Sequence, residues 1–225
     1  MKKIFSPDGL LWRILNTLTD VFALSVIWLF CCIPIVTVGS ATTALYDSVV
    51  RCIRYRESSP YRRFFRTFRA DLGTAIASTV LWEGIIGFGF LALHFLRTLG
   101  ESSDSAAAAS AAYYIILVLP CGGACWAFPV LSRFTYSFKE LNLTAMKIAI
   151  GFLPRTVVLV LMTAELVSIC VHMIFPVFFL PACMMLLWSL FIEPVFTKLG
   201  GGLKKEPENE SPPPEDPEEE IQDAE

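Results

Sequence analysis

The sequence predicts an all-α fold, a polytopic transmembrane helical bundle of about five spans. Hydrophobic residues make up 55% of the 225 residues, charged residues only 17%, and the mean hydropathy is +0.59. A soluble domain carries about 25% charged residues, because its surface must be wetted. Here the charges are gathered in a few segments, which leaves long uncharged runs between them. This pattern indicates that lipid is the main solvent of the chain.

The uncharged runs are continuous rather than alternating, which favours helices over the strands of a barrel. A helix needs about 20 apolar residues to cross a hydrocarbon core about 30 Å thick. Lipid offers no hydrogen bonds to an open backbone, so each crossing must be a complete helix. We expect the transmembrane domain to cover residues 21–198, with spans at approximately 21–38, 72–96, 111–132, 148–170 and 174–192.

Prolines and glycines decide where two of these runs divide. The first span follows an N-terminal interfacial segment, residues 1–20, and is interrupted by Pro34 and Gly39. Its helix is therefore expected to end between Ile33 and Val38, with a second helical piece beginning near Ser40. The last run, residues 148–192, is too long for one helix. A break at Pro176 turns it into a hairpin of two spans.

The arrangement of basic residues predicts the orientation. Cytoplasmic loops of membrane proteins are enriched in Lys and Arg. With five spans, one side of the membrane receives 14 basic residues, from segments 51–69, 133–155 and 198–205, and the other side receives four. With four spans the division becomes eleven against seven. The chain is thus expected in the cell membrane with its N-terminus outside and its C-terminus in the cytoplasm.

The C-terminal segment differs from the rest of the chain. Its last twenty residues hold ten acidic side chains and no basic one. Such a composition cannot bury a core. We therefore expect residues 199–225 to form a disordered acidic cytoplasmic tail.

A short basic and aromatic segment, residues 61–70, precedes the second span and predicts an amphipathic helix at the membrane surface. Its aromatic face can enter the acyl boundary while its guanidinium groups meet anionic head groups. The alternative is a docking helix for a partner protein. In both cases the residues involved are Arg62, Arg63, Phe64, Phe65, Arg66, Phe68 and Arg69. A segment of similar design, residues 134–148, leads into the fourth span.

Ionisable residues inside the predicted spans need a partner, a cavity or a neutral state. Glu83 and Arg155 differ in expected depth by only about 6 Å at helical rise, so we expect them to form an ion pair. Glu165 is expected near the outer interface, and Glu193 near the inner boundary in contact with solvent. These groups either fix which helices are neighbours or line a route for a proton or solute.

No motif of catalysis or cofactor binding accompanies these residues. Cys121 and Cys125 share a helical face, but no histidine or further cysteine joins them as a metal ligand. The sequence contains no H-E-x-x-H, G-x-S-x-G or phosphate-binding glycine loop. We expect neither an enzyme, nor a metal or cofactor site, nor nucleic-acid binding.

Four motifs resemble those of a known family. They are the stretch LFCCIPIVTVGSATTAL at residues 29–45, FFRTFR at 64–69, FPVLSRF at 128–134 and LPRT at 153–156. Together they resemble the YesL-like family of bacterial integral membrane proteins, over about residues 5–198. That family has no known biochemical activity and is often encoded beside carbohydrate ABC transporters and two-component sensors in Gram-positive bacteria.

The resemblance implies an accessory or regulatory membrane protein associated with carbohydrate ABC uptake. Its expected partners are the lipid bilayer and the membrane subunits of an ABC transporter or sensor. The alternative is a small secondary transporter, or a solute or proton pathway, that uses Glu83, Arg155 and Glu165.

Overall fold

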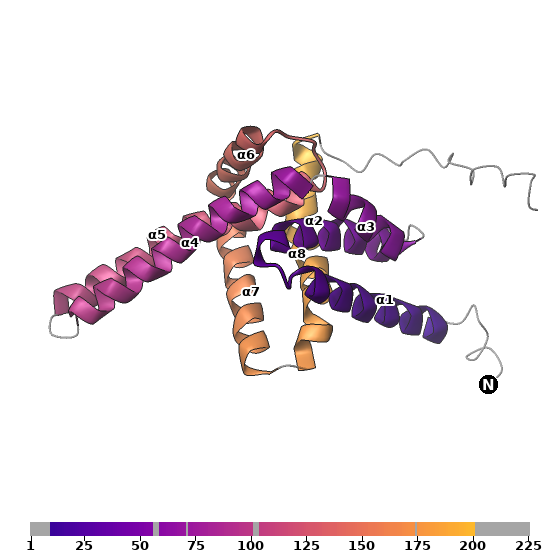
Figure 1. Cartoon of the computed structure of the whole chain (residues 1–225), viewed down its shortest axis with the longest axis horizontal. Coiled ribbons are helices and arrows are strands. Elements are labelled where there is room, and N and C mark those ends of the chain that lie inside the picture. Colours follow the sequence, from indigo (N-terminus) through magenta and orange to yellow (C-terminus); the bar gives the residue numbers. More distant parts are fainter. Residues whose placement is uncertain (1–9, 56–58, 71, 101–103, 174, 201–225) are drawn as a thin grey trace, which may run out of the picture.

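The computed structural model describes residues 10–55, 59–70, 72–100, 104–173 and 175–200. Within these ranges all the regular secondary structure is helical (Figure 1). The elements in chain order are α1 (Leu10–Cys31), the 3₁₀ turn η1 (Ile35–Thr37), α2 (Val38–Ser48), the π-helical turn η2 (Val49–Arg54), α3 (Pro60–Ala70), α4 (Leu72–Gly100), α5 (Asp104–Leu131), α6 (Phe138–Gly151), α7 (Leu153–His172), the 3₁₀ turn η3 (Phe175–Phe178) and α8 (Leu180–Lys198).

Four helices of the described residues are long and apolar enough to cross a membrane. They are Leu72–Thr98, Ala112–Leu131, Leu153–His172 and Leu180–Lys198, and a shorter apolar helix covers Leu15–Cys31. The predicted class, an all-α multi-pass membrane protein, is confirmed. The expected acidic tail lies outside the described residues from position 201 onward.

The element boundaries differ from the expected spans at the prolines. α1 ends at Cys31, before Pro34, and the hydroxyl of Thr37 donates to the carbonyl of Cys31 at 2.6 Å. α2 then begins at Val38, close to the second helical piece expected near Ser40. The fourth span, expected at residues 148–170, begins later, as α7 at Leu153, because Pro154 has no backbone N–H to continue the hydrogen bonds of α6.

The short helix α2 lies at the centre of the bundle (Figure 1). Every residue from Gly39 to Ser48 is buried, and α2 packs against α1, α3, α4, α5 and α8. At 11 residues it is about 16 Å long, too short to span a bilayer. Its small side chains let neighbours approach closely: a methyl group built on Gly39 would overlap Thr79 and the ring of Phe128.

Helices α4 and α5 pack side by side and extend away from the other helices as an arm (Figure 1). The apolar part of α4, 27 residues, is about 40 Å long, while α7, with 20 residues, is about 30 Å long. A longer apolar helix fits the same hydrocarbon core by tilting, which agrees with the inclination of the arm to α7 in Figure 1. Exposed apolar side chains of the arm, such as Phe88 and Ile115, provide a lipid-facing surface.

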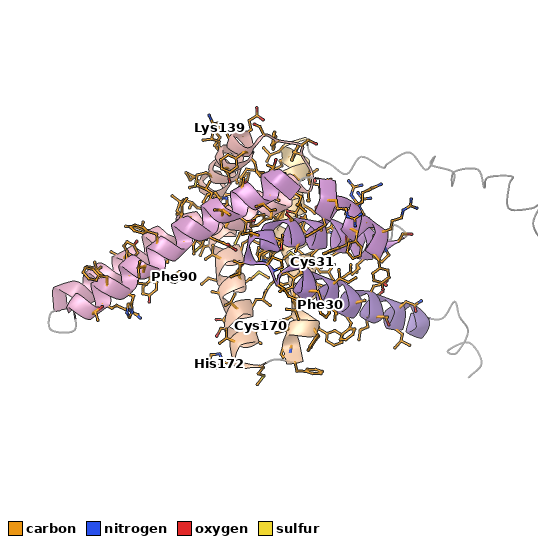
Figure 2. The ribbon with its side chains drawn as sticks, viewed as in Figure 1. Phe30, Cys31, Phe90, Lys139, Cys170 and His172 are labelled. Carbon is orange, nitrogen blue, oxygen red and sulfur yellow. The ribbon has the colours of Figure 1, made fainter. Side chains whose placement is uncertain are left out.

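The helix ends divide the molecule into two sides. The start of α4, the end of α5, the start of α7 and the end of α8 gather with α2, α3 and α6, and we call this the basic end (Figure 1). The end of α4, the start of α5, the end of α7 and the start of α8 lie away from it (Figure 1). Lys139 on α6 marks the basic end, and His172 at the end of α7 marks the opposite side (Figure 2).

The close approach at Gly39 leads to a test of α2 as the centre of the fold. Gly39→Leu should lower the midpoint of thermal unfolding in detergent, because overpacking costs about 1–3 kcal/mol. Gly87→Leu in α4 is the matched control, since nothing lies within 4 Å of a methyl group built there. Equal midpoints for the two variants would contradict the central packing of α2.

Candidate functional site

The structure does not bring Glu83 and Arg155 together. Helix α5 packs against both α4 and α7 and lies between them, and in the described part of the chain no ion pair joins the two side chains. Arg155 instead lies over the ring of Phe152, with its guanidinium carbon 5.6 Å from the ring centroid. Glu83 is half-buried on α4, and Glu165 is exposed on α7. The predicted ion pair is wrong, because residues at a similar depth along two helices can face different sides of the bundle.

Helix α3 differs from the expected arrangement in its aromatic face. Phe64 is fully buried in the protein core rather than in lipid, and Phe68 stacks on it at a centroid distance of 6.2 Å. Phe65 is 43% exposed. The aromatic face is used mainly for packing against α2, so the face assigned to lipid is largely the protein-facing face.

The arginines of α3 divide into two groups. Arg63 points into the protein toward Asp47, whereas Arg62, Arg66 and Arg69 are exposed. Tyr61 connects the start of α3 to α1, because its hydroxyl donates to Asp20 at 2.8 Å. Burial, followed by the hydrogen bond and charge of Asp20, raises the pKa of Tyr61 to about 12. The phenol therefore keeps its proton, and this hydrogen bond, at neutral pH.

Asp47, near the end of α2, is the centre of a buried ion-pair network. It is 1% exposed. Arg51 Nε lies 3.0 Å from Oδ1, and Arg63 Nε lies 2.7 Å from Oδ2. The hydroxyl of Thr67 also donates to Oδ2, at 3.0 Å. Arginines of η2 and α3 thus neutralise the Asp47 carboxylate, and a hydroxyl group of α3 donates a hydrogen bond to it.

Arg133, in the linker between α5 and α6, extends the network to α8. Its Nη1 is 3.7 Å from Asp47 Oδ1, and its Nη2 donates to Glu193 Oε1 at 2.7 Å. Tyr46 on α2 donates to the same Glu193 oxygen at 3.1 Å. Glu193 is 6% exposed, so the expectation that it is solvated is wrong. Its partners on α2 and the α5–α6 linker hold it in the protein.

We call Asp47, Arg51, Arg63, Thr67, Arg133 and Glu193 the Asp47 network. It joins the consecutive segments α2, η2 and α3 to the α5–α6 linker and to α8, which are distant from them in sequence. Next to it, Arg54 Nη1 donates to Ser189 on α8 at 2.7 Å. The π-helical turn η2 places Arg51 and Arg54 against different segments, and π-helical turns occur frequently at functional sites.

Sequence reasoning did not find this network. Asp47 was not among the predicted site residues, and the arginines of segments 51–69 and 133–155 were counted only as charges that set the orientation. One local signal was present, since the spacing of Asp47 and Arg51 is that of an i,i+4 helical ion pair. The other partners are far apart in sequence, so spacing could not indicate them.

The network offers ion pairing and packing rather than redox or nucleophilic groups. No cluster of three His, Cys, Asp or Glu side chains that could hold a metal ion occurs among the described residues.

In a comparison with known protein families, one region of the chain matches a family model. The family model described as "Protein of unknown function, DUF624" matches residues 21–93, about a third of the chain. No curated protein and no solved structure matches. The matched region includes α2, η2 and α3, and with them Asp47, Arg51 and Arg63. Arg133 and Glu193, the remaining charged residues of the network, lie outside it.

Removing the central carboxylate tests the network. Asp47→Asn should destabilise the protein by about 3–5 kcal/mol, because it leaves buried guanidinium groups without their counter-charge. The measurement is chemical or thermal unfolding in detergent. Asp20→Asn is the matched control, because it removes a carboxylate whose partner is exposed. A loss of stability no larger for Asp47→Asn than for Asp20→Asn would contradict the structural role of the network.

Proposed function

We propose that this multi-pass membrane protein is an accessory or regulatory subunit that acts through contacts with other membrane proteins rather than by catalysis. The observation that carries the proposal is the way α3 is held. Arg63 pairs with Asp47 and Phe64 is buried beneath the helix. Together they leave Arg62, Arg66 and Arg69 exposed on a fixed support.

A helix held in this way suits recognition. The backbone of a fixed helix loses little freedom on binding, and the planar guanidinium groups pair with carboxylates in fixed geometry. Phe65 lies among them and adds apolar contact area. The expected partner surface is therefore acidic with an apolar centre, on a membrane protein or at an anionic lipid surface.

The proposed orientation places the basic end in the cytoplasm. It has support from the distribution of charge: the described basic residues of η2, α3, α6, the α5–α6 linker and the start of α7 lie at this end, while Arg97 lies on the opposite side, over the ring of Tyr114. An excess of Lys and Arg is typical of cytoplasmic loops. We therefore propose an external N-terminus and a cytoplasmic C-terminus.

The link to sugar uptake rests on the resemblance of the four sequence motifs to the YesL-like family. Under this proposal the partners are membrane subunits of a carbohydrate ABC transporter or an associated sensor. The DUF624 description itself names no activity.

The alternative of a small transporter has less support from the geometry. Glu83, Arg155 and Glu165 do not converge, and Glu165 is exposed on the outer half of α7. A relay needs neighbouring groups at successive depths. We therefore prefer the accessory role.

The accessory role predicts which proteins bind to the chain. The tagged full-length chain, purified from native membranes in mild detergent, should retain subunits of a carbohydrate ABC transporter or a sensor. The triple variant Arg62→Ala, Arg66→Ala, Arg69→Ala should lose most of them, as measured by quantitative mass spectrometry. Lys139→Ala with Lys147→Ala on α6 is the control for general loss of charge. Undiminished recovery with the triple variant would refute docking through α3.

The proposed orientation of the chain in the membrane can be tested with reporter fusions. Green fluorescent protein fused to the C-terminus should fluoresce, because it matures in the cytoplasm. Alkaline phosphatase inserted between α4 and α5 should be active, because it requires the exterior. The reversed pattern, a non-fluorescent C-terminal fusion together with an inactive inserted phosphatase, would overturn the proposed orientation.

A further inference from the structure

Glu83 on α4 is an ionisable residue at membrane depth that the described part of the chain leaves without a partner. It lies about 17 Å from the start of the apolar span Leu72–Thr98, which is about 40 Å long. Within the described residues its carboxylate has no hydrogen bond and no ion pair. Its oxygens are not fully enclosed, so a group outside the protein can reach them.

The surface of α4 beside Glu83 is apolar and open. About one helical turn before and after it, Val80 is 54% exposed and Gly87 is exposed. Nothing lies within 4 Å of a methyl group built on Gly84 or on Gly87. Small residues on the surface of a membrane helix allow the backbone of a second helix to approach closely. This face of α4 can therefore accept another transmembrane helix.

A carboxyl group in this position is costly when only lipid surrounds it. Ionisable residues inside spans almost always face the bundle interior or a cavity, or pair with another group. Protonation would remove the charge of Glu83, but the neutral O–H would still need an acceptor that lipid tails do not provide. A basic side chain from a neighbouring helix would both neutralise the carboxylate and donate hydrogen bonds to it.

A second copy of this chain does not supply such a group at the right depth. The arginines inside the four spans of the described residues are Arg97 and Arg155. Arg97 lies about 21 Å beyond Glu83 on the same helix, and Arg155 lies only about 3 Å from the start of α7, at the basic end. In a copy with the same orientation both arginines would lie at other depths than Glu83. The charge of Glu83 therefore points to a different protein.

We propose that the face of α4 around Glu83 binds a transmembrane helix of a partner protein, in which an arginine or lysine near the middle of the membrane pairs with Glu83. The inference rests on the accessory role proposed above and specifies the chemistry of the partner. It adds a contact inside the membrane to the contact proposed for α3, which lies at the basic end.

The experiment uses the full-length protein in phosphatidylcholine vesicles and a synthetic transmembrane helix of leucine and alanine. One form of the peptide carries a single central arginine, and the other carries leucine there. Each has a photoreactive residue next to the central position. Crosslinking to α4 is measured by mass spectrometry as the peptide concentration is raised. The arginine peptide should half-saturate at a concentration about tenfold lower than the leucine peptide, the effect of one charge-assisted hydrogen bond.

Three variants show which residues are responsible. Glu83→Gln should remove the preference for the arginine peptide. Gly84→Leu should weaken crosslinking to α4, because its side chain would stand between the two helices. Glu165→Gln is the matched control, because it removes an exposed carboxylate of another span, and it should change crosslinking to α4 less than twofold.

A saturable preference of α4 for the arginine peptide, lost in Glu83→Gln and kept in Glu165→Gln, supports the proposal. Equal crosslinking of the two peptides, or equal effects of the two Gln variants, would overturn it. A dimer of the chain in native mass spectrometry that disappears with Glu83→Gln would assign this face to a second copy, and would also overturn it. The triple arginine variant of α3 should bind the arginine peptide normally, so a failure of docking through α3 remains distinguishable from a failure at Glu83.

Discussion

The fold depends on one buried carboxylate, Asp47, and on the arginines that neutralise it. Removing an ionised group from water costs several kcal/mol, and only close opposite charges and hydrogen bonds can offset this cost. Asp47 obtains them from η2, from α3 and from the α5–α6 linker. The positions of these segments are therefore coupled, and Arg133 extends the coupling to Glu193 on α8.

This constraint explains why a non-spanning helix can occupy the centre of a membrane protein. A short helix with broken backbone at its start is tolerated at membrane depth only where other protein surrounds it. α2 is enclosed by α1, α3, α4, α5 and α8. Its small residues allow the close contacts. Asp47 near its end attaches it to its neighbours through ion pairs with Arg51, Arg63 and Arg133. Helix α3, which carries the exposed arginines, packs against α2 at this attachment.

The sequence predicted the membrane class and the helical breaks near Pro34 and Pro176, because composition, run length and proline are local properties. Prediction of the site failed for two physical reasons. Depth along a helix axis can be counted from sequence, but the direction around the axis cannot, so Glu83 and Arg155 were matched although α5 lies between them. Arg133 was counted only as a charge on the cytoplasmic side, yet its side chain is 2% exposed, because its partners come from segments far away in sequence.

The most direct measurement is a double-mutant cycle across the contact between α2 and α3. Asp47→Asn, Arg63→Gln and the double variant are unfolded in the same detergent, and the three losses of stability are compared. If Asp47 and Arg63 stabilise each other as their 2.7 Å contact indicates, the double variant should lose less than the sum of the single variants, with a coupling energy between about 0.5 and 3 kcal/mol. Additive losses would mean that the two residues act independently, and would contradict the central role of the Asp47 network.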